Sequence, residues 1–301
     1  MFDFRYHVAS LAAVFVALII GILVGVGLSG QGFVTDSERE RLEGDKAQLE
    51  GQLEAERNRA DALERGQQAG ADFAEDAYPV LAADRLRGQR IALVVVGSLG
   101  DTDAVEQVRE AIGDAAGRIV RTYALRVPLE PAAVQERLRR RPELSGYMGR
   151  DHLDDLGRDI GRELVEQGPT PLLDALADEL VEERFGPSDI GADGVVVVRT
   201  TPPQMGPTAD FVNGLYSGVA SAGVPAVGAE TSEAVPSAVP AFSRSQLSTV
   251  DDVDTPSGHL ALVLLLAGGE PGNYGRQEDT AGDGILPPIE PLADEPRDGG
   301  G

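Results

Sequence analysis

The chain has 301 residues, of which 26 are Lys or Arg and 50 are Asp or Glu, so its formal net charge is −24. This excess of negative charge repels nucleic-acid phosphates, and we therefore expect no nucleic-acid partner. The chain contains no Cys, which excludes disulfides, thiolate metal sites and a cysteine nucleophile. The length allows one or two domains.

The first apolar segment is residues 8–28, a run of 21 residues without a charge. As a helix it is roughly 31 Å long, enough to cross a hydrocarbon core of about 30 Å. A cleaved signal peptide is the alternative, but its apolar region would be shorter and would end in a small-residue cleavage site. We favour an uncleaved anchor over residues 1–30 that spans the lipid bilayer once, with the N-terminus in the cytoplasm and the rest outside.

Small side chains recur at every fourth position of this anchor. A stripe of this kind lets two helix backbones approach closely, although small residues are common in membrane helices in general. We expect self-association of the chain through this stripe, which consists of Ala13, Ala17, Gly21, Gly25 and Ser29.

Residues 31–70 predict a helical stalk, because the segment 36–68 is rich in Glu, Arg, Gln and Ala and contains no Pro. Leucines at positions 42, 49 and 63 occupy d positions of an imperfect heptad pattern, and Leu53 occupies an a position. The pattern favours a parallel coiled-coil dimer, with a solvated single helix as the alternative.

Residues 71–284 predict an α/β head with a mostly parallel, Rossmann-like sheet, since continuous apolar strands alternating with helices are typical of a sheet covered on both faces. Strands are expected at residues 91–96, 119–125, 195–198 and 224–227, and helices at 103–116, 131–140, 153–167, 171–185 and 208–222. The apolar run 260–267 is too short to span a membrane and is expected to form a buried helix. Residues 285–301 form a tail rich in Pro, Gly and acidic residues.

A glycine turn follows the first expected strand, where a phosphate-binding turn would lie. Gly97 and Gly100 lack the G-x-G-x-x-G spacing of dinucleotide sites. Asp101 and Asp103 place negative charge at the start of the next helix, where a phosphate would need to dock. We therefore expect no nucleotide cofactor.

Two groups of residues offer metal ligands. Asp251, Asp252 and Asp254 precede the last helix; three carboxylates can hold a hard cation, but acidic residues at a helix start are more commonly caps or dipole partners. Met148 and His152 are four residues apart and offer soft ligands to copper if one helix carries both, although such a pair is more often an ordinary surface feature.

No catalytic constellation is expected, and we predict that the chain is not an enzyme. The hydroxyl and imidazole groups that remain lie in no G-x-S-x-G elbow or related motif; they belong to Ser98, Ser243, Ser245 and His259.

Three segments carry a family resemblance: the N-terminal FRYHVASLAAVFVALIIGILVGVG, the stalk after it, and the C-terminal STVDDVDTPSGHLALVLLLAGGEPGNYGRQEDTAGDGILPP. They resemble the actinobacterial MctB-like family of copper transport proteins. The most specific parts are residues 248–258, the Asn273-Tyr274-Gly275 run and the later Leu-Pro-Pro. The resemblance implies a cell-envelope protein of copper efflux or copper tolerance, with copper as the metal it handles and an outer membrane as its location.

Two functions fit these expectations. In the first, an anchored oligomer moves or buffers copper outward, and any channel requires association of several chains because one helix cannot enclose a pore. In the second, the stalk holds the head away from the membrane as a scaffold or binding module, without a pore of its own, that recognises a wall component or a protein partner.

Overall fold

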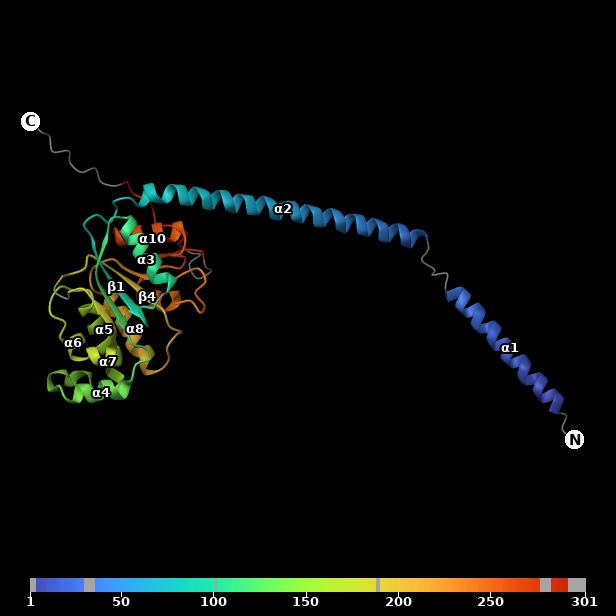
Figure 1. Ribbon diagram of the computed structural model, residues 1–301, viewed down its shortest axis with the longest axis horizontal. Helices are drawn as coiled ribbons and strands as arrows, with labels where there is room; N and C mark the ends of the chain where they lie inside the picture. The colour runs from blue at the N-terminus through green and yellow to red at the C-terminus, as the bar shows by residue number, and fades with distance from the viewer. Residues whose placement is uncertain (1–3, 30–35, 101, 188–189, 277–282, 292–301) are drawn as a thin grey trace, which may run out of the picture. The chain divides into compact units, whose positions relative to one another are not determined.

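The computed structural model describes residues 4–29, 36–100, 102–187, 190–276 and 283–291, with side chains described from residue 8 to 27 and again from 38. The chain divides into two parts, residues 1–69 and residues 70–301. The first part contains the N-terminal helix and most of the helix that follows, and the second contains a sheet with helices on both faces (Figure 1).

The N-terminal helix α1 (Phe4–Ser29) confirms the expected apolar helix. Its segment Val8–Gly27 has 20 residues and a mean hydropathy of 2.8, and none of it is buried within the chain. Its length and composition suffice to cross a bilayer.

Helix α2 (Asp36–Ala82) is one continuous helix of 47 residues. It extends beyond the expected segment 36–68, because its last turns bury Tyr78 and Ala82 in the core of the second part. The Tyr78 hydroxyl donates to Asp114 Oδ2 at 3.1 Å, and the Tyr78 ring lies 5.4 Å from the ring of His259. The end of α2 therefore belongs to the head.

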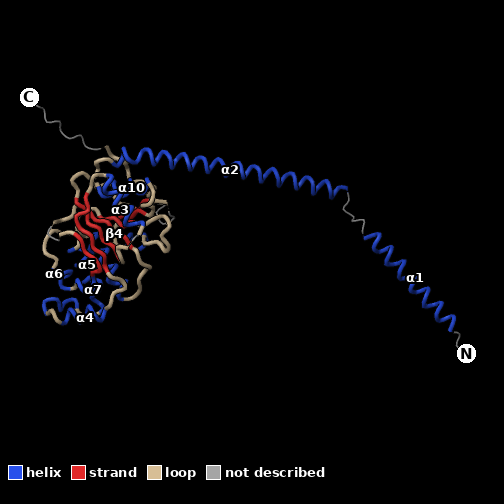
Figure 2. Tube along the Cα trace, viewed as in Figure 1, coloured by secondary structure: helices blue, strands red, loops and turns tan. Residues whose placement is uncertain are grey.

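The head contains a seven-stranded sheet in the order β3-β2-β1-β4-β5-β6-β7. All neighbouring pairs are parallel except β2 with β3, so the expected mostly parallel sheet is confirmed. Figure 2 shows the strands gathered together with helices around them. The strands are β1 (Arg90–Val96), β2 (Arg118–Leu125), β3 (Val181–Phe185), β4 (Gly194–Arg199), β5 (Ala226–Ala229), β6 (Ser248–Val250) and β7 (Asn273–Tyr274).

Helices cover both faces of the sheet. The α-helices of the head are α3 (Asp103–Asp114), α4 (Pro131–Arg139), α5 (Leu153–Glu163), α6 (Pro171–Ala175), α7 (Ala177–Leu180), α8 (Pro207–Ala220), α9 (Val239–Arg244) and α10 (Pro256–Leu266). Two short 3₁₀ helices, η1 (Pro142–Tyr147) and η2 (Arg150–His152), connect α4 to α5.

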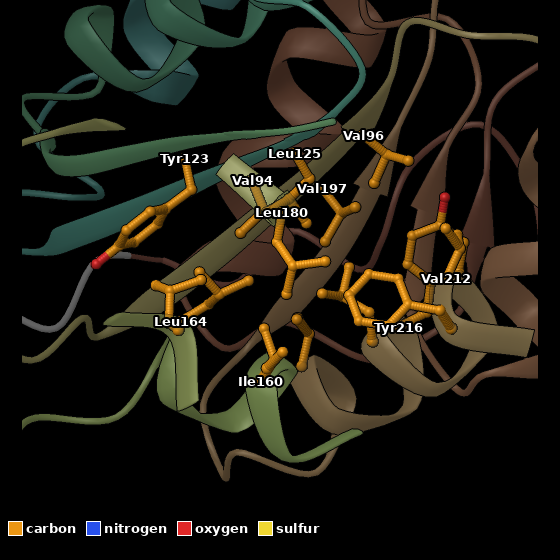
Figure 3. Packing of buried hydrophobic residues seen from close by; sticks show 14 of the residues in the cluster. Val94, Val96, Tyr123, Leu125, Ile160, Leu164, Leu180, Val197, Val212 and Tyr216 are labelled. Carbon is orange, nitrogen blue, oxygen red and sulfur yellow. The ribbon is translucent and has the colours of Figure 1, made fainter. Parts of the chain in front are cut away.

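Alternating residues of the central strands enter two separate cores. In β1, Val94 and Val96 pack with α5 and α8, whereas Leu93 and Val95 pack with α3 and α10. The side-chain period of two in a strand sends neighbours to opposite faces, so a strand covered on both faces must be apolar throughout. Figure 3 shows the first of these cores, where Val94 and Val197 of the sheet lie near Ile160 and Tyr216 of the helices.

Helices α5 and α8 cross in direct backbone contact through two pairs of glycines. A Cβ on Gly157 would lie 2.1 Å from Phe211 O, and a Cβ on Gly218 would lie 2.0 Å from Arg158 O. Gly161 and Gly214 are equally close to the facing backbone. Only glycine allows this crossing distance, which brings the apolar faces of both helices onto the sheet.

The expected helix over residues 171–185 is wrong in its second half. The chain forms the short helices α6 and α7 and then β3, which pairs antiparallel with β2. The four β3 residues after Val181 are exposed and mostly charged, as is common in an edge strand. Residues 181–185 form a strand because they pair with the distant β2, and the local sequence pattern does not show this pairing.

Smaller differences have similar causes. The helix expected over 153–167 ends at Glu163, and the strand expected at 224–227 lies two residues later as β5. Strands β6 and β7 were not expected, because three and two residues are too few to show a period. The helix expected at 260–267 is confirmed as α10, whose described residues from Ser257 onward are all buried.

Candidate functional site

The candidate site lies at the carboxyl ends of the parallel strands. From β1 the chain moves to β2 on one side, whereas β4, β5 and β6 follow on the other side. Open α/β sheets bind ligands in the crevice at such a reversal of strand order. Here the crevice lies between the loops that follow β1 and β4.

The two loops at the crevice are tied together. Thr200 Oγ1 donates to Ser98 O at 3.1 Å, and Thr201 Oγ1 donates to Val96 O at 3.3 Å. Gly97 has a φ of +126°, and a Cβ there would lie 2.3 Å from Thr200 Oγ1. Gly97 therefore allows the loops after β1 and β4 to pack closely. Asp103 lies in the first turn of α3, where its negative charge would oppose a bound anion.

A pocket of about 460 Å³ opens beside this crevice. Its walls come from the start of α3, the end of β4 and the loop after β5. Arg199 lies on one wall and its Nη2 donates to Pro236 O at 2.6 Å. Glu230 is buried on another wall, where its carboxylate accepts from Ser237 Oγ at 2.6 Å and Ala238 N at 2.5 Å. Burial raises the pKa of Glu230, and these hydrogen bonds and Arg199 oppose the shift.

Two fully buried aspartates follow β6, next to Glu230. Asp251 Oδ1 accepts from the backbone N–H of Arg276 at 2.8 Å. Asp252 Oδ2 accepts from Thr255 Oγ1 at 3.1 Å and lies 3.4 Å from Arg276 Nε, while Asp252 Oδ1 has no hydrogen-bond partner among the described residues. Burial, reinforced by Asp251, raises the pKa of Asp252 to about 6.

The third aspartate of the sequence cluster, Asp254, points elsewhere. Its carboxylate accepts from the Ser232 N–H at 2.7 Å and the Ser232 hydroxyl at 2.6 Å, in the loop after β5. The helix cap of α10 is Thr255, whose Oγ1 accepts from the Gly258 N–H at 3.0 Å. Asp251 and Asp252 thus both contact Arg276 after β7, whereas Asp254 holds the loop after β5. The described residues include no group of three or more His, Asp or Glu side chains that could hold a metal ion.

Met148 and His152 do not share a helix. Met148 follows η1 with extended backbone, Gly149 has a φ of +107°, and α5 begins at Leu153. Met148 packs against the core beside α5, whereas the exposed His152 places Nδ1 3.4 Å from Asp155 Oδ2. The expected ligand pair required one helix to carry both residues, and the structure places them on different segments.

The stripe expected to mediate self-association lies on α1. Ala13, Ala17, Gly21 and Gly25 are exposed at intervals of four residues. Among the described residues, a Cβ on either Gly21 or Gly25 would meet no atom within 4 Å outside the adjoining backbone of α1. The side chain of Ser29 lies outside the described residues.

Known proteins resemble this chain over nearly its whole length. Residues 1–282 match the profile of the family described as "Copper transport outer membrane protein, MctB". The chain belongs to this MctB family. Copper transporter MctB proteins of Mycobacterium bovis and Mycobacterium tuberculosis are 27% identical over 308 residues, which covers 91% of this chain and 96% of theirs. Family membership and α1 together fit a single-pass membrane protein.

The MctB match includes most of the C-terminal run, up to residue 282, and the structure shows what part of this run does. Asn273 Oδ1 accepts from Ser243 Oγ at 2.7 Å and from Thr249 Oγ1 at 2.9 Å, which joins β7 to β6 and α9. Gly275 and Arg276, which follow β7, contact the carboxylate of Asp251. These specific residues of the MctB resemblance hold the last strand in place.

Two residues of this edge were not expected from the sequence. Glu230 follows a strand of only four residues, and a polar residue after a short apolar run is the one signal that marks it. Arg276 carries no sequence signal, because its relation to Asp252 arises only when β7 pairs with β6.

Proposed function

We propose that this chain acts in copper export across the cell envelope as a membrane-anchored, non-enzymatic protein. The supporting observation is the MctB match over residues 1–282, which includes the apolar helix, the stalk and the head. In this proposal α1 spans one membrane, the N-terminus is cytoplasmic and the head lies outside. In this proposal copper is the transported ion, and an oligomer of this chain moves it.

The donor chemistry limits how tightly this chain could hold copper. Soft ligands are few, because the chain contains no Cys, three His and three Met. Copper(I) prefers thiolate and thioether ligands. We therefore expect the purified full-length chain to bind copper no more tightly than the micromolar range.

The surroundings of the candidate hydroxyl and imidazole groups support a non-enzymatic role. His259 Nε2 lies 2.9 Å from Gln107 Oε1, and the Ser243 hydroxyl donates to Asn273. These contacts are structural, since they join α10 to α3 and α9 to β7.

The test is copper tolerance of the native host. Deletion of the gene is expected to increase copper sensitivity, and the full-length chain is expected to restore tolerance. A matched variant without residues 8–27 should fail to restore it, because the head then lacks its anchor. Unchanged copper tolerance after deletion would overturn the export proposal.

The pocket beside Arg199 favours a second function, in which the head recognises a polar wall component or a protein partner. The polar residues Arg199, Thr200 and Thr231 are among those that line the pocket. Wall fragments that bind there should raise the melting temperature of the full-length chain, and Arg199→Gln should abolish that shift. Copper tolerance does not enter this measurement, so the two functions can be separated.

A further inference from the structure

The exposed leucines of α2 form the strongest unassigned surface of the molecule. Leu42, Leu49, Leu53 and Leu63 are 62%, 64%, 52% and 64% exposed. Their spacing of seven, four and ten residues places them in one stripe along the helix. A single helix leaves this stripe in water, so the stalk calls for a partner of complementary shape and charge.

The heptad positions indicate what kind of partner fits. With Leu42, Leu49 and Leu63 at d, Leu53 and Ala60 lie at a, which is the seam of a two-stranded coiled coil. Gly44 and Gly51 then fall at f, on the face away from the seam. The two glycines that weaken the helix therefore leave no gap in the contact.

We propose that residues 42–63 of α2 pair with a second copy of this chain as a parallel, in-register coiled coil. The carrying observation is charge complementarity at the two polar seam positions, Lys46 at a and Glu56 at d.

In a parallel dimer, each seam side chain inserts between four residues of the facing helix. The hole around Lys46 includes Asp45 of the second copy, and the hole around Glu56 includes Arg57 of the second copy. Each polar seam residue thus has one opposite charge in its hole, which offsets the like charge of the same residue in the second copy. A Lys at a single a position also specifies register and oligomeric state.

An antiparallel pair centred on residue 51 also matches charges, because it places Lys46 opposite Glu56. The anchor decides between the two arrangements. Antiparallel pairing separates the two Asp36 starts by about 45 Å along the stalk, whereas the chain between Ser29 and Asp36 reaches at most about 25 Å. Two stalks that both stand upright on one membrane can therefore pair only in parallel. This step rests on α1 being a membrane anchor and is independent of copper export.

The absence of Cys from the chain allows a direct test by single-cysteine crosslinking of the full-length protein in membranes. Leu42→Cys and Leu63→Cys should form disulfide-linked dimers on mild oxidation. Gly44→Cys and Asn58→Cys, at f positions on the outer face, are matched controls and should crosslink at least tenfold more slowly. All four positions are exposed, so none of the changes disturbs the fold. Equal crosslinking at seam and outer positions would overturn the proposal.

Two further outcomes distinguish the arrangements. Co-expression of Leu42→Cys with Ala60→Cys should give little mixed dimer, and a mixed dimer as abundant as the Leu42→Cys dimer would show antiparallel pairing instead. Lys46→Glu should weaken dimerisation at least tenfold in detergent, and adding Asp45→Lys should restore it. Rescue by Glu56→Lys in place of Asp45→Lys would overturn the parallel register.

Discussion

Gly275 lies so close to Asp251 that no side chain fits between them: a Cβ on Gly275 would be 1.7 Å from Asp251 Oδ1. The buried carboxylate occupies this space while it accepts from the Arg276 N–H. This contact joins the end of β7 to the end of β6 at the carboxyl edge of the sheet.

Gly275→Ala should destabilise the head by about 2–4 kcal/mol, because the methyl group collides with the Asp251 carboxylate and the backbone φ of +139° is strained for alanine. Urea unfolding of the full-length chain in detergent measures the loss. Gly113→Ala is the control: it lies in α3 with no atom within 4 Å of its Cβ, and it should stabilise the chain slightly. Equal stability of the two variants would contradict the packing argument.

Asp252 should make stability fall with rising pH. Its pKa is raised from 3.8 to about 6 in the folded chain, so between these values the folded state binds more protons than the unfolded state. Stability contributed by the protonated carboxyl is present below about pH 4 and is lost as pH rises to about 6.

Asp252→Asn removes this titration. The variant should therefore gain stability relative to the wild type by about 3 kcal/mol in total across this window, which urea unfolding at a series of pH values measures. The raised pKa of Glu230 affects both proteins and cancels in the difference. Arg276→Gln should shift the upper end of the window to higher pH, because Arg276 lowers the pKa of Asp252. A pH-independent difference would refute this.

Asp254→Ala and Thr255→Ala should affect different segments although the residues are neighbours. Asp254 holds Ser232, and Thr255 caps α10. Asp254→Ala should speed hydrogen exchange at the Ser232 amide, whereas Thr255→Ala should speed it at Gly258, each with a loss of about 1 kcal/mol. Faster exchange at Gly258 in Asp254→Ala would instead support a capping role for the aspartate.

Gly218→Ala should destabilise the head by about 2–3 kcal/mol, because its methyl group would meet Arg158 O at the crossing of α5 and α8. Thermal unfolding of the full-length chain reports the loss. Gly206→Ala is a weaker comparison because of its positive φ, so Gly113→Ala again serves as the reference. A melting temperature equal to that of Gly113→Ala would show that α5 and α8 accommodate the methyl group without loss of stability.

Gly21→Leu combined with Gly25→Leu should weaken association of α1 without changing the head, because a Cβ at either position would meet no other described segment of the chain within 4 Å. Crosslinking in detergent measures the dimer, and thermal unfolding of the head is the control. An unchanged oligomer would refute pairing through the stripe.

The two glycine patterns show where sequence reasoning succeeds and where it stops. Glycines four residues apart in α1 stand out because their surroundings are uniformly apolar. The same spacing at Gly157 and Gly161 passes unnoticed, because its partner is a helix some fifty residues away. Only the folded chain shows that Gly214 and Gly218 face them.

The sequence by itself determined the apolar N-terminal helix, the long polar helix and the parallel sheet. Each of these depends on a local period or on an uninterrupted apolar run such as residues 91–96. The tertiary structure decided the edge strand β3, the glycine crossing and the separate roles of Asp251, Asp252 and Asp254. Those features depend on which distant segments meet, and a carboxylate's role is set by the groups that surround it after folding.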